Sequence, residues 1–164
     1  MVRLEPDTML LEIGKLAVDQ AEIKDRTAFF DVAASTAATI IGHRLFTIMA
    51  FHEQTMEVER LYSNQPDAYP AGGRKKKRDT DWGRQVLENG KPFIGRSADD
   101  IREHFNDYEV ILSLGLEAIL NMPIRLGGKT IGTMNLLDEA DYYCETDIVS
   151  AQLIAGLIGA RLAE

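Results

Sequence analysis

Residues 117–138 read EAILNMPIRLGGKTIGTMNLLD, and this stretch decides the fold. Apolar residues alternate on both sides of Gly127-Gly128, which is the pattern of two antiparallel strands joined by a tight turn. A two-residue turn would pair positions whose numbers sum to 255, and it would place Asn121 and Asn135 on opposite faces. A three-residue loop with Gly128 as a left-handed bulge makes the sum 254 and brings both amides to one face. We expect the bulged register because it separates polar from apolar side chains.

The expected hairpin has one oily face and one mixed face. The oily face contains Leu120, Met122, Ile124, Met134 and Leu136. The mixed face contains Ile119, Asn121, Thr133 and Asn135. A face of this mixed composition suits the lining of a ligand cavity. Because a buried amide must find a hydrogen-bond partner, Asn121 and Asn135 either contact a ligand or bond to a neighbouring loop.

The hydrophobic period predicts the elements that precede this hairpin. Helical spacing of apolar residues indicates helices over residues 7–20 and 25–41. Residues 43–52 carry apolar side chains on both parities, which predicts a central strand covered on both faces. Residues 55–63 alternate and form its half-exposed partner. One face of that partner holds Met56, Val58, Arg60 and Tyr62.

The segment between the two strand pairs is irregular, and a helix follows the second pair. Residues 64–78 hold two prolines, two adjacent glycines and five consecutive cations, so we expect a long loop there. Thr80 and Ser97 are the expected N-caps of two short helices. A short strand over residues 92–94 lies between them, and a further helical patch covers residues 108–114. The last helix, over residues 146–162, is apolar on more than one stripe, so its surplus apolar surface needs a partner.

Length, charge and cysteine content restrict the function. The 164 residues predict one domain, which we divide into an N-terminal helical extension, 1–24, and a main domain, 25–164. With 18 basic and 26 acidic residues the net charge is −8, which disfavours nucleic acid and anionic membranes as partners. Cys144 is the single cysteine, which excludes an intrachain disulfide and fits a reducing cytoplasm. No signal peptide or membrane-spanning run is visible, so we expect a cytoplasmic protein.

No catalytic or metal-binding motif stands out. The spacing of His43, His52 and His104 is not that of metal ligands, and we expect neither a metal nor another cofactor. No Ser-His-Asp order, phosphate loop or paired-carboxylate motif is present. The residues therefore give no positive indication of catalysis.

The order of helix, strand pair, long loop with small helices, glycine-turned hairpin and terminal helix resembles a GAF domain over roughly residues 25–163. The strings that carry the resemblance are Leu120-Asn121-Met122-Pro123-Ile124 and Ile131-Gly132-Thr133-Met134-Asn135-Leu136. A bacterial subgroup in which the GAF domain is nearly the whole protein is indicated by Tyr69-Pro70, Gly72-Gly73 and Asp81-Trp82-Gly83-Arg84.

The resemblance implies an α+β fold in which a central antiparallel sheet carries the N- and C-terminal helices on one face. On the other face it implies a small-molecule pocket under loops and short helices. It also implies a homodimer formed through the terminal helices. The function that follows is a non-catalytic sensor of a small polar metabolite, which passes its signal to a separate output protein.

Two alternatives stay open. The free methionine-(R)-sulfoxide reductases are GAF-fold enzymes that use cysteine chemistry, whereas residues 62–118 of this chain contain no thiol. Trp82-Gly83 lies about where such an enzyme has Cys-Gly, so that activity is disfavoured. The other alternative is a scaffold with a vestigial pocket whose helical face binds a partner chain.

Aromatic, imidazole and amide side chains around the expected pocket are the candidate ligand contacts. They are Tyr62, Tyr69, Trp82, Phe93, His104 and Asn121. Each also has a structural explanation; Trp82, for example, either stacks on a ligand or fills the small core beneath the loop. The basic run from Arg74 to Arg78 is a solvated loop, a gate for an anionic ligand or a docking site for an acidic or nucleic-acid partner.

Overall fold

Two long strands, β1 (Leu45–His52) and β6 (Lys129–Asp138), form the centre of a six-stranded antiparallel sheet in the computed structural model, which describes residues 3–164. The strand order is β3-β2-β1-β6-β5-β4. The remaining strands are β2 (Glu57–Ser63), β3 (Arg74–Lys76), β4 (Phe93–Gly95) and β5 (Ala118–Leu126). The prediction of a central strand over residues 43–52 is confirmed, since β1 is buried over most of its length.

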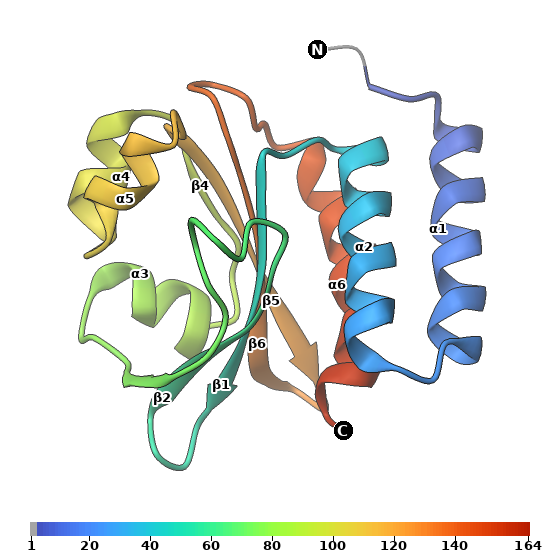
Figure 1. Cartoon of the computed structure of the whole chain (residues 1–164), viewed down its shortest axis with the longest axis horizontal. Coiled ribbons are helices and arrows are strands. Elements are labelled where there is room, and N and C mark those ends of the chain that lie inside the picture. The colour runs from blue at the N-terminus through green and yellow to red at the C-terminus, as the bar shows by residue number, and fades with distance from the viewer. Residues whose placement is uncertain (1–2) are drawn as a thin grey trace.

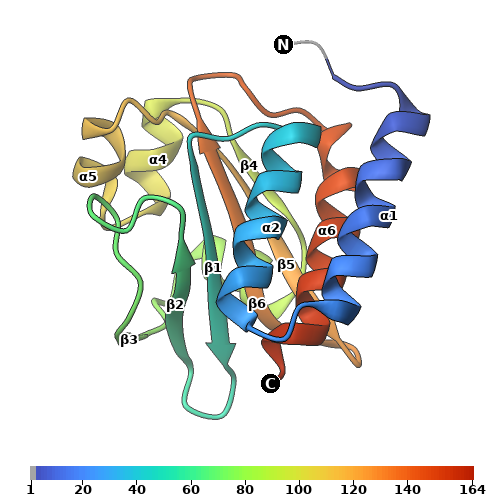
Figure 2. The same cartoon turned by 45° about the vertical axis from the view of Figure 1, so that its right-hand side comes forward.

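Helices cover both faces of the sheet. On one face, α2 (Arg26–Ile40) and α6 (Asp147–Leu162) pack directly on the strands, and α1 (Pro6–Glu22) forms an outer layer against both (Figure 1). The other face carries α3 (Asp81–Gly83), the π-helical turn η1 (Arg84–Glu88), α4 (Ala98–His104) and α5 (Tyr108–Ser113). Figure 2 shows the same layers from a second direction. The predicted α+β fold is confirmed.

The main core lies between the sheet and α2 and α6. It contains the oily face of the expected hairpin, including Leu120, Met122 and Met134, all fully buried. A smaller core under α4 and α5 includes Leu45, Ile101 and Ile111. Among residues 3–164, no helix is long and apolar enough to cross a membrane.

The face assignment of the hairpin is confirmed, but the expected register is wrong. Leu126 pairs with Lys129 across a two-residue turn in which Gly127 and Gly128 both have positive φ, 58° and 80°. An irregularity at Ile131 then shifts the pairing, so that Asn121 lies opposite Asn135 and the numbers sum to 256. The bulge therefore lies in β6 and not in the turn, and the parity of the two faces is the same as predicted.

A second bulge changes the face of one candidate residue. Ile48 pairs with Tyr62, but the next residue, Met49, pairs with Arg60, so Leu61 is the extra residue in β2. Because a one-residue shift moves side chains to the opposite face, Arg60 and Tyr62 do not share a face as predicted.

The expected loop over residues 64–78 contains a strand. Residues 74–76 of β3 pair with β2, and Arg74 lies opposite Glu59 with its Nε 3.4 Å from the Glu59 carboxylate. Lys76 lies opposite Glu57. Opposite charges across the ladder stabilise this edge pairing, which hydrophobic periodicity alone does not reveal.

Candidate functional site

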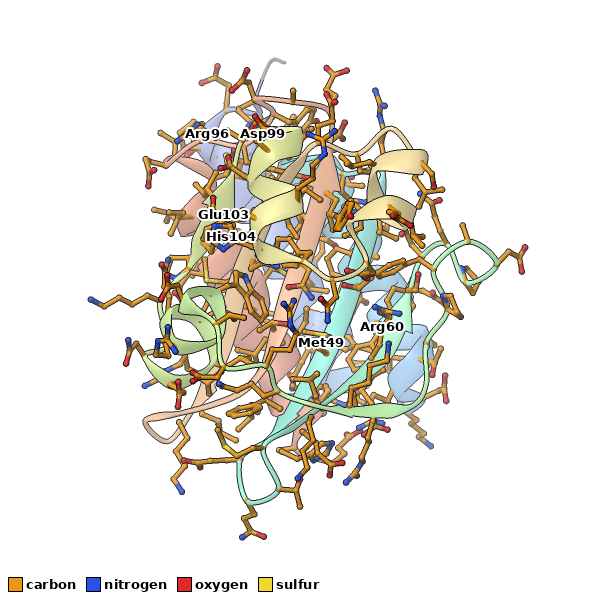
Figure 3. All side chains as sticks on the ribbon, turned by 90° about the vertical axis from the view of Figure 1, so that its left-hand side faces the viewer. Met49, Arg60, Arg96, Asp99, Glu103 and His104 are labelled. Carbon is orange, nitrogen blue, oxygen red and sulfur yellow. The ribbon has the colours of Figure 1, made fainter. Side chains whose placement is uncertain are left out.

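A cavity of about 250 Å³ lies between the mixed face of the sheet and the short helices. Its floor comes from β1, β5 and β6, one wall from α3, α4 and α5, and its rim from β2, β3 and the segment that follows β3. Figure 3 looks onto this side of the molecule, with His104 on one side and Arg60 on the other. The volume is slightly below the range of about 300 to 1,000 Å³ typical of ligand pockets, and it fits a small molecule.

A chain of hydrogen bonds crosses the cavity floor from the wall to the central strand. The indole Nε1 of Trp82 donates to Asn121 Oδ1 at 2.9 Å, and Asn121 Nδ2 donates to Asn135 Oδ1 at 2.7 Å. Asn135 Nδ2 in turn donates to Thr47 Oγ1 at 3.1 Å. We call Trp82, Asn121, Asn135 and Thr47 the polar ladder.

The indole nitrogen fixes the direction of the polar ladder. An indole N–H can only donate, so the Asn121 oxygen must face Trp82 and the Asn121 amide nitrogen must face Asn135. The same reasoning orients the Asn135 amide nitrogen toward Thr47. Thr47 therefore accepts with its hydroxyl oxygen and keeps its own hydrogen to donate. Thr47 is 3% exposed and lines the cavity.

A second polar group closes one end of the cavity. The Tyr69 hydroxyl donates to the Asp107 carboxylate, and the Arg60 guanidinium lies 3.7 Å from the centre of the Tyr69 ring. Arg60 also lies 3.8 Å from Asp107 and donates to the Pro70 carbonyl at 2.8 Å. Burial and the Asp107 charge raise the pKa of Tyr69, so its hydroxyl stays protonated and acts as a donor.

Four of the six predicted contacts line the cavity. They are Tyr69, Trp82, His104 and Asn121. Phe93 does not line it; its ring packs edge-on against His104 at 4.8 Å and also meets Phe105. Phe93 thus packs against the wall residues His104 and Phe105 without lining the cavity itself.

Tyr62, predicted as a ligand contact, does not line the cavity. Its ring lies in the main core on the helix-covered face, 6.0 Å from Phe30, and its hydroxyl donates to Asp31 of α2 at 2.7 Å. The bulge at Leu61 is the reason, because it turns Tyr62 away from the face that Arg60 occupies. Tyr62 therefore stabilises the packing of α2 on the sheet.

The polar cavity residues that sequence reasoning missed include Thr47, Arg60 and Asp107. Alternation along residues 43–52 assigns the Thr47 side chain to one face of the predicted strand. Nothing in the sequence identifies Thr47 as the end of a hydrogen-bond chain. Arg60 was assigned to the face of Tyr62. Asp107 lies in the turn before α5, where periodicity carries no signal.

The single thiol of the chain is remote from this site. Cys144 is exposed just before α6 and is not among the cavity-lining residues. Its Sγ lies 3.0 Å from Thr146 Oγ1, and its backbone N–H donates to Asp147 at 3.0 Å. No group of three or more metal-ligating side chains occurs within residues 3–164.

A central antiparallel sheet with helices on one face and a roofed cavity on the other defines a class of small α+β domain. The model of the GAF domain family matches residues 24–163, and the chain belongs to that family. GAF domains are typically small-molecule-binding sensor domains. No curated protein sequence matches the chain.

Solved structures share the fold at low sequence identity. The GAF domain of a phosphoenolpyruvate-protein phosphotransferase from Coxiella burnetii superposes with a TM-score of 0.75 at 14% identity, over 94% of this chain and 92% of that one. The corresponding domain from Acinetobacter gives 0.76 at 10% identity, over 97% and 95%. Free methionine-R-sulfoxide reductase from Neisseria meningitidis, solved with its substrate, gives 0.66 at 14% identity, over 99% and 95%.

Proposed function

We propose that this chain is a non-catalytic sensor that binds a small polar metabolite in the cavity above the polar ladder. The observation that carries the proposal is the combination of a 250 Å³ cavity with a buried, directed hydrogen-bond chain on its floor. Apolar side chains of Phe105, Ile111 and Leu137 complete the lining. A few convergent polar groups in a mainly apolar cavity are what orientation-specific binding requires.

The signal is proposed to leave through the terminal helices. α2 and α6 pack on the sheet face opposite the cavity, and α1 covers them, so a shift of the strands on ligand binding is transmitted to this helical layer. A cytoplasmic homodimer that forms through these helices and contacts a separate output protein is the assembly we propose.

A thermal-shift screen against purines, amino acids and small organic acids tests ligand binding. A ligand at about 100 times its dissociation constant adds about 2.7 kcal/mol to the free energy of unfolding, which raises Tm by about 5 to 10 °C for a domain of this size. We expect Asn121→Leu to lose this shift. The matched control is Asn89→Leu, because Asn89 is exposed and outside the cavity. An equal shift in both variants contradicts the assignment of the site.

A second candidate is an enzyme related to the sulfoxide reductases, and the likeness to the Neisseria enzyme favours it. Cys144 is exposed away from the cavity, so such chemistry would proceed without a thiol of this chain at the site. The test is turnover of free methionine sulfoxide with a thiol reductant. Turnover that survives in Cys144→Ser would support this candidate over the sensor.

A further inference from the structure

The charge around the cavity is opposite in sign to that of the whole chain. Five basic side chains line the cavity, and Asp107 is the single carboxylate among its lining residues. The five are Arg60, Lys75, Lys76, Lys77 and Arg78. The chain as a whole carries a net charge of −8. A local reversal of this kind attracts anions to the mouth of the cavity.

Two of these cations, Lys75 and Arg78, have neither a counter-ion nor a hydrogen-bond partner for their side chains among the described residues. Arg60 lies 3.8 Å from Asp107, Lys77 lies 3.7 Å from Glu88, and Lys76 donates to the Thr55 carbonyl at 2.7 Å. Within residues 3–164, no ion pair or hydrogen bond involves the side chain of Lys75 or that of Arg78.

The strand register places Lys75 on the cavity side. Lys75 lies opposite Val58, which also lines the cavity, whereas Arg74 lies opposite Glu59 and does not line it. Lys75 therefore shares a strand face with the cavity-lining Val58, while Arg74 and Lys76 lie on the other face opposite glutamates, and of those two only Lys76 reaches the cavity lining.

The floor of the cavity favours the same kind of ligand group. The polar ladder ends at the Thr47 hydroxyl, which accepts from Asn135 and has its hydrogen free to donate. A buried donor that faces a cavity needs an acceptor, such as a ligand oxygen. The cavity thus offers a ligand one hydrogen-bond donor at its floor and an excess of positive charge at its rim.

We propose that the ligand is a small organic carboxylate. Its apolar body lies against Trp82, Phe105 and Ile111, one carboxylate oxygen accepts from the Thr47 hydroxyl, and Lys75 and Arg78 neutralise the charge from the rim. The proposal rests on the proposed function, because it names the ligand class of the same cavity. The cavity volume, about 250 Å³, favours a compact acid over a nucleotide.

The test uses benzoate, nicotinate and indole-3-carboxylate, each beside its uncharged carboxamide. Trp82 is the single tryptophan of the chain, so its indole ¹H–¹⁵N resonance is one signal at the cavity floor. We expect at least one carboxylate to move this signal and to bind at least tenfold more tightly than its carboxamide. We also expect its affinity to fall as ionic strength rises, because the rim charges are exposed to solvent.

Charge variants identify the residues responsible. Lys75→Gln and Arg78→Gln should each weaken carboxylate binding several-fold and leave carboxamide binding unchanged. Lys91→Gln is the matched control, because it removes the same charge from an exposed lysine that does not line the cavity. Thr47→Val should weaken the carboxylate, whereas Thr47→Ser, which keeps the hydroxyl, should restore binding and thereby exclude a general loss of folding.

Several outcomes overturn the proposal. Carboxamides that bind as tightly as carboxylates, a Lys91→Gln effect equal to that of Arg78→Gln, or no response to any carboxylate would each contradict it. The sensor function would fail separately, and only if no metabolite of any charge stabilised the protein in the thermal-shift screen.

Discussion

His43 follows α2 in the chain, and its imidazole is hydrogen-bonded to the backbone of that helix. Its Nε2 lies 2.8 Å from the Ala34 carbonyl, which can only accept, so Nε2 carries the hydrogen. The other ring nitrogen, Nδ1, is buried and has no hydrogen-bond partner within residues 3–164. Burial lowers the pKa of His43, and the hydrogen bond to Ala34 opposes this effect only in part.

The protein should therefore lose stability as pH falls through the ordinary titration range of histidine. In the unfolded chain, His43 binds a proton at about pH 6.5. In the folded protein its pKa is lower, so the folded state binds fewer protons in this range. The free energy of unfolding therefore rises with pH there. We expect wild type to gain stability relative to His43→Gln between about pH 5 and pH 7, measured by urea denaturation. A difference between the two proteins that is independent of pH would contradict this account.

Single residues also show how far the sequence predicts the site. Trp82 and Asn121 were expected at the cavity, and the structure joins them directly at 2.9 Å. Tyr62 was misplaced because a bulge at Leu61 reverses parity, and alternation of residue types does not reveal a bulge in a strand whose two faces are both partly buried. The role of Thr47 depends on the direction of three successive hydrogen bonds, which only the folded structure defines.

At the scale of elements, α6 holds α1 through two arginines near the two ends of α1. Arg3, just before α1, pairs with the buried Asp147 at 2.7 Å. At the other end, Arg161 of α6 donates to the carbonyls of Gln20, Ile23 and Lys24 at 3.3, 2.7 and 2.9 Å. A cation at the carboxyl end of a helix also interacts favourably with the helix dipole.

Removal of the Arg161 side chain should loosen the end of α1 first. Arg161→Ala leaves three carbonyls without this donor, and we expect the free energy of unfolding to fall by about 2 to 3 kcal/mol. Amide hydrogen exchange should show the largest loss of protection in the last turn of α1. Arg161→Lys keeps the charge but loses the planar guanidinium group, so its free energy of unfolding should lie between those of wild type and Arg161→Ala. Unchanged exchange in α1 after Arg161→Ala would refute this role.

The hairpin shows which element properties the sequence predicts. The separation of polar from apolar residues predicted the two faces of the hairpin correctly. When one face of a strand is buried, that burial strongly determines which alternate residues point to the core. The predicted register was wrong by two positions, one because the turn has two residues instead of three and one because Ile131 is an extra residue in β6. Gly132 was the available signal: a Cβ there would lie 2.2 Å from the Met49 carbonyl oxygen, and a glycine inside a strand often marks a bulge or a close approach. The strand β3 was not predicted because it is stabilised by charge pairing with Glu59, which leaves no hydrophobic periodicity in its sequence.

At the scale of the whole molecule, apolar side chains are exposed on the helical layer. On α1, Leu10, Leu11 and Val18 are 69%, 66% and 61% exposed. On α6, Val149 and Leu153 are 67% and 48% exposed. The surplus apolar stripe expected from residues 146–162 is therefore present, and it is the surface we propose for the homodimer.

Light scattering coupled to gel filtration tests this assembly. We expect a dimer for the wild type and a monomer for Leu11→Glu/Leu153→Glu, because charges in an apolar interface are costly to bury. Val110→Glu is the control, since Val110 is 42% exposed on α5, on the opposite side of the sheet. A monomeric wild type at micromolar concentration would exclude the dimer.

The indole ¹H–¹⁵N resonance of Trp82 is the most direct probe of ligand binding in the cavity above the polar ladder. The measurement uses protein freed of bound small molecules by unfolding and refolding, mixed with size-fractionated metabolites from a bacterial extract. We expect at least one fraction to move this resonance in wild type and not in Asn121→Leu. A resonance that stays fixed in every fraction would contradict ligand binding in this cavity.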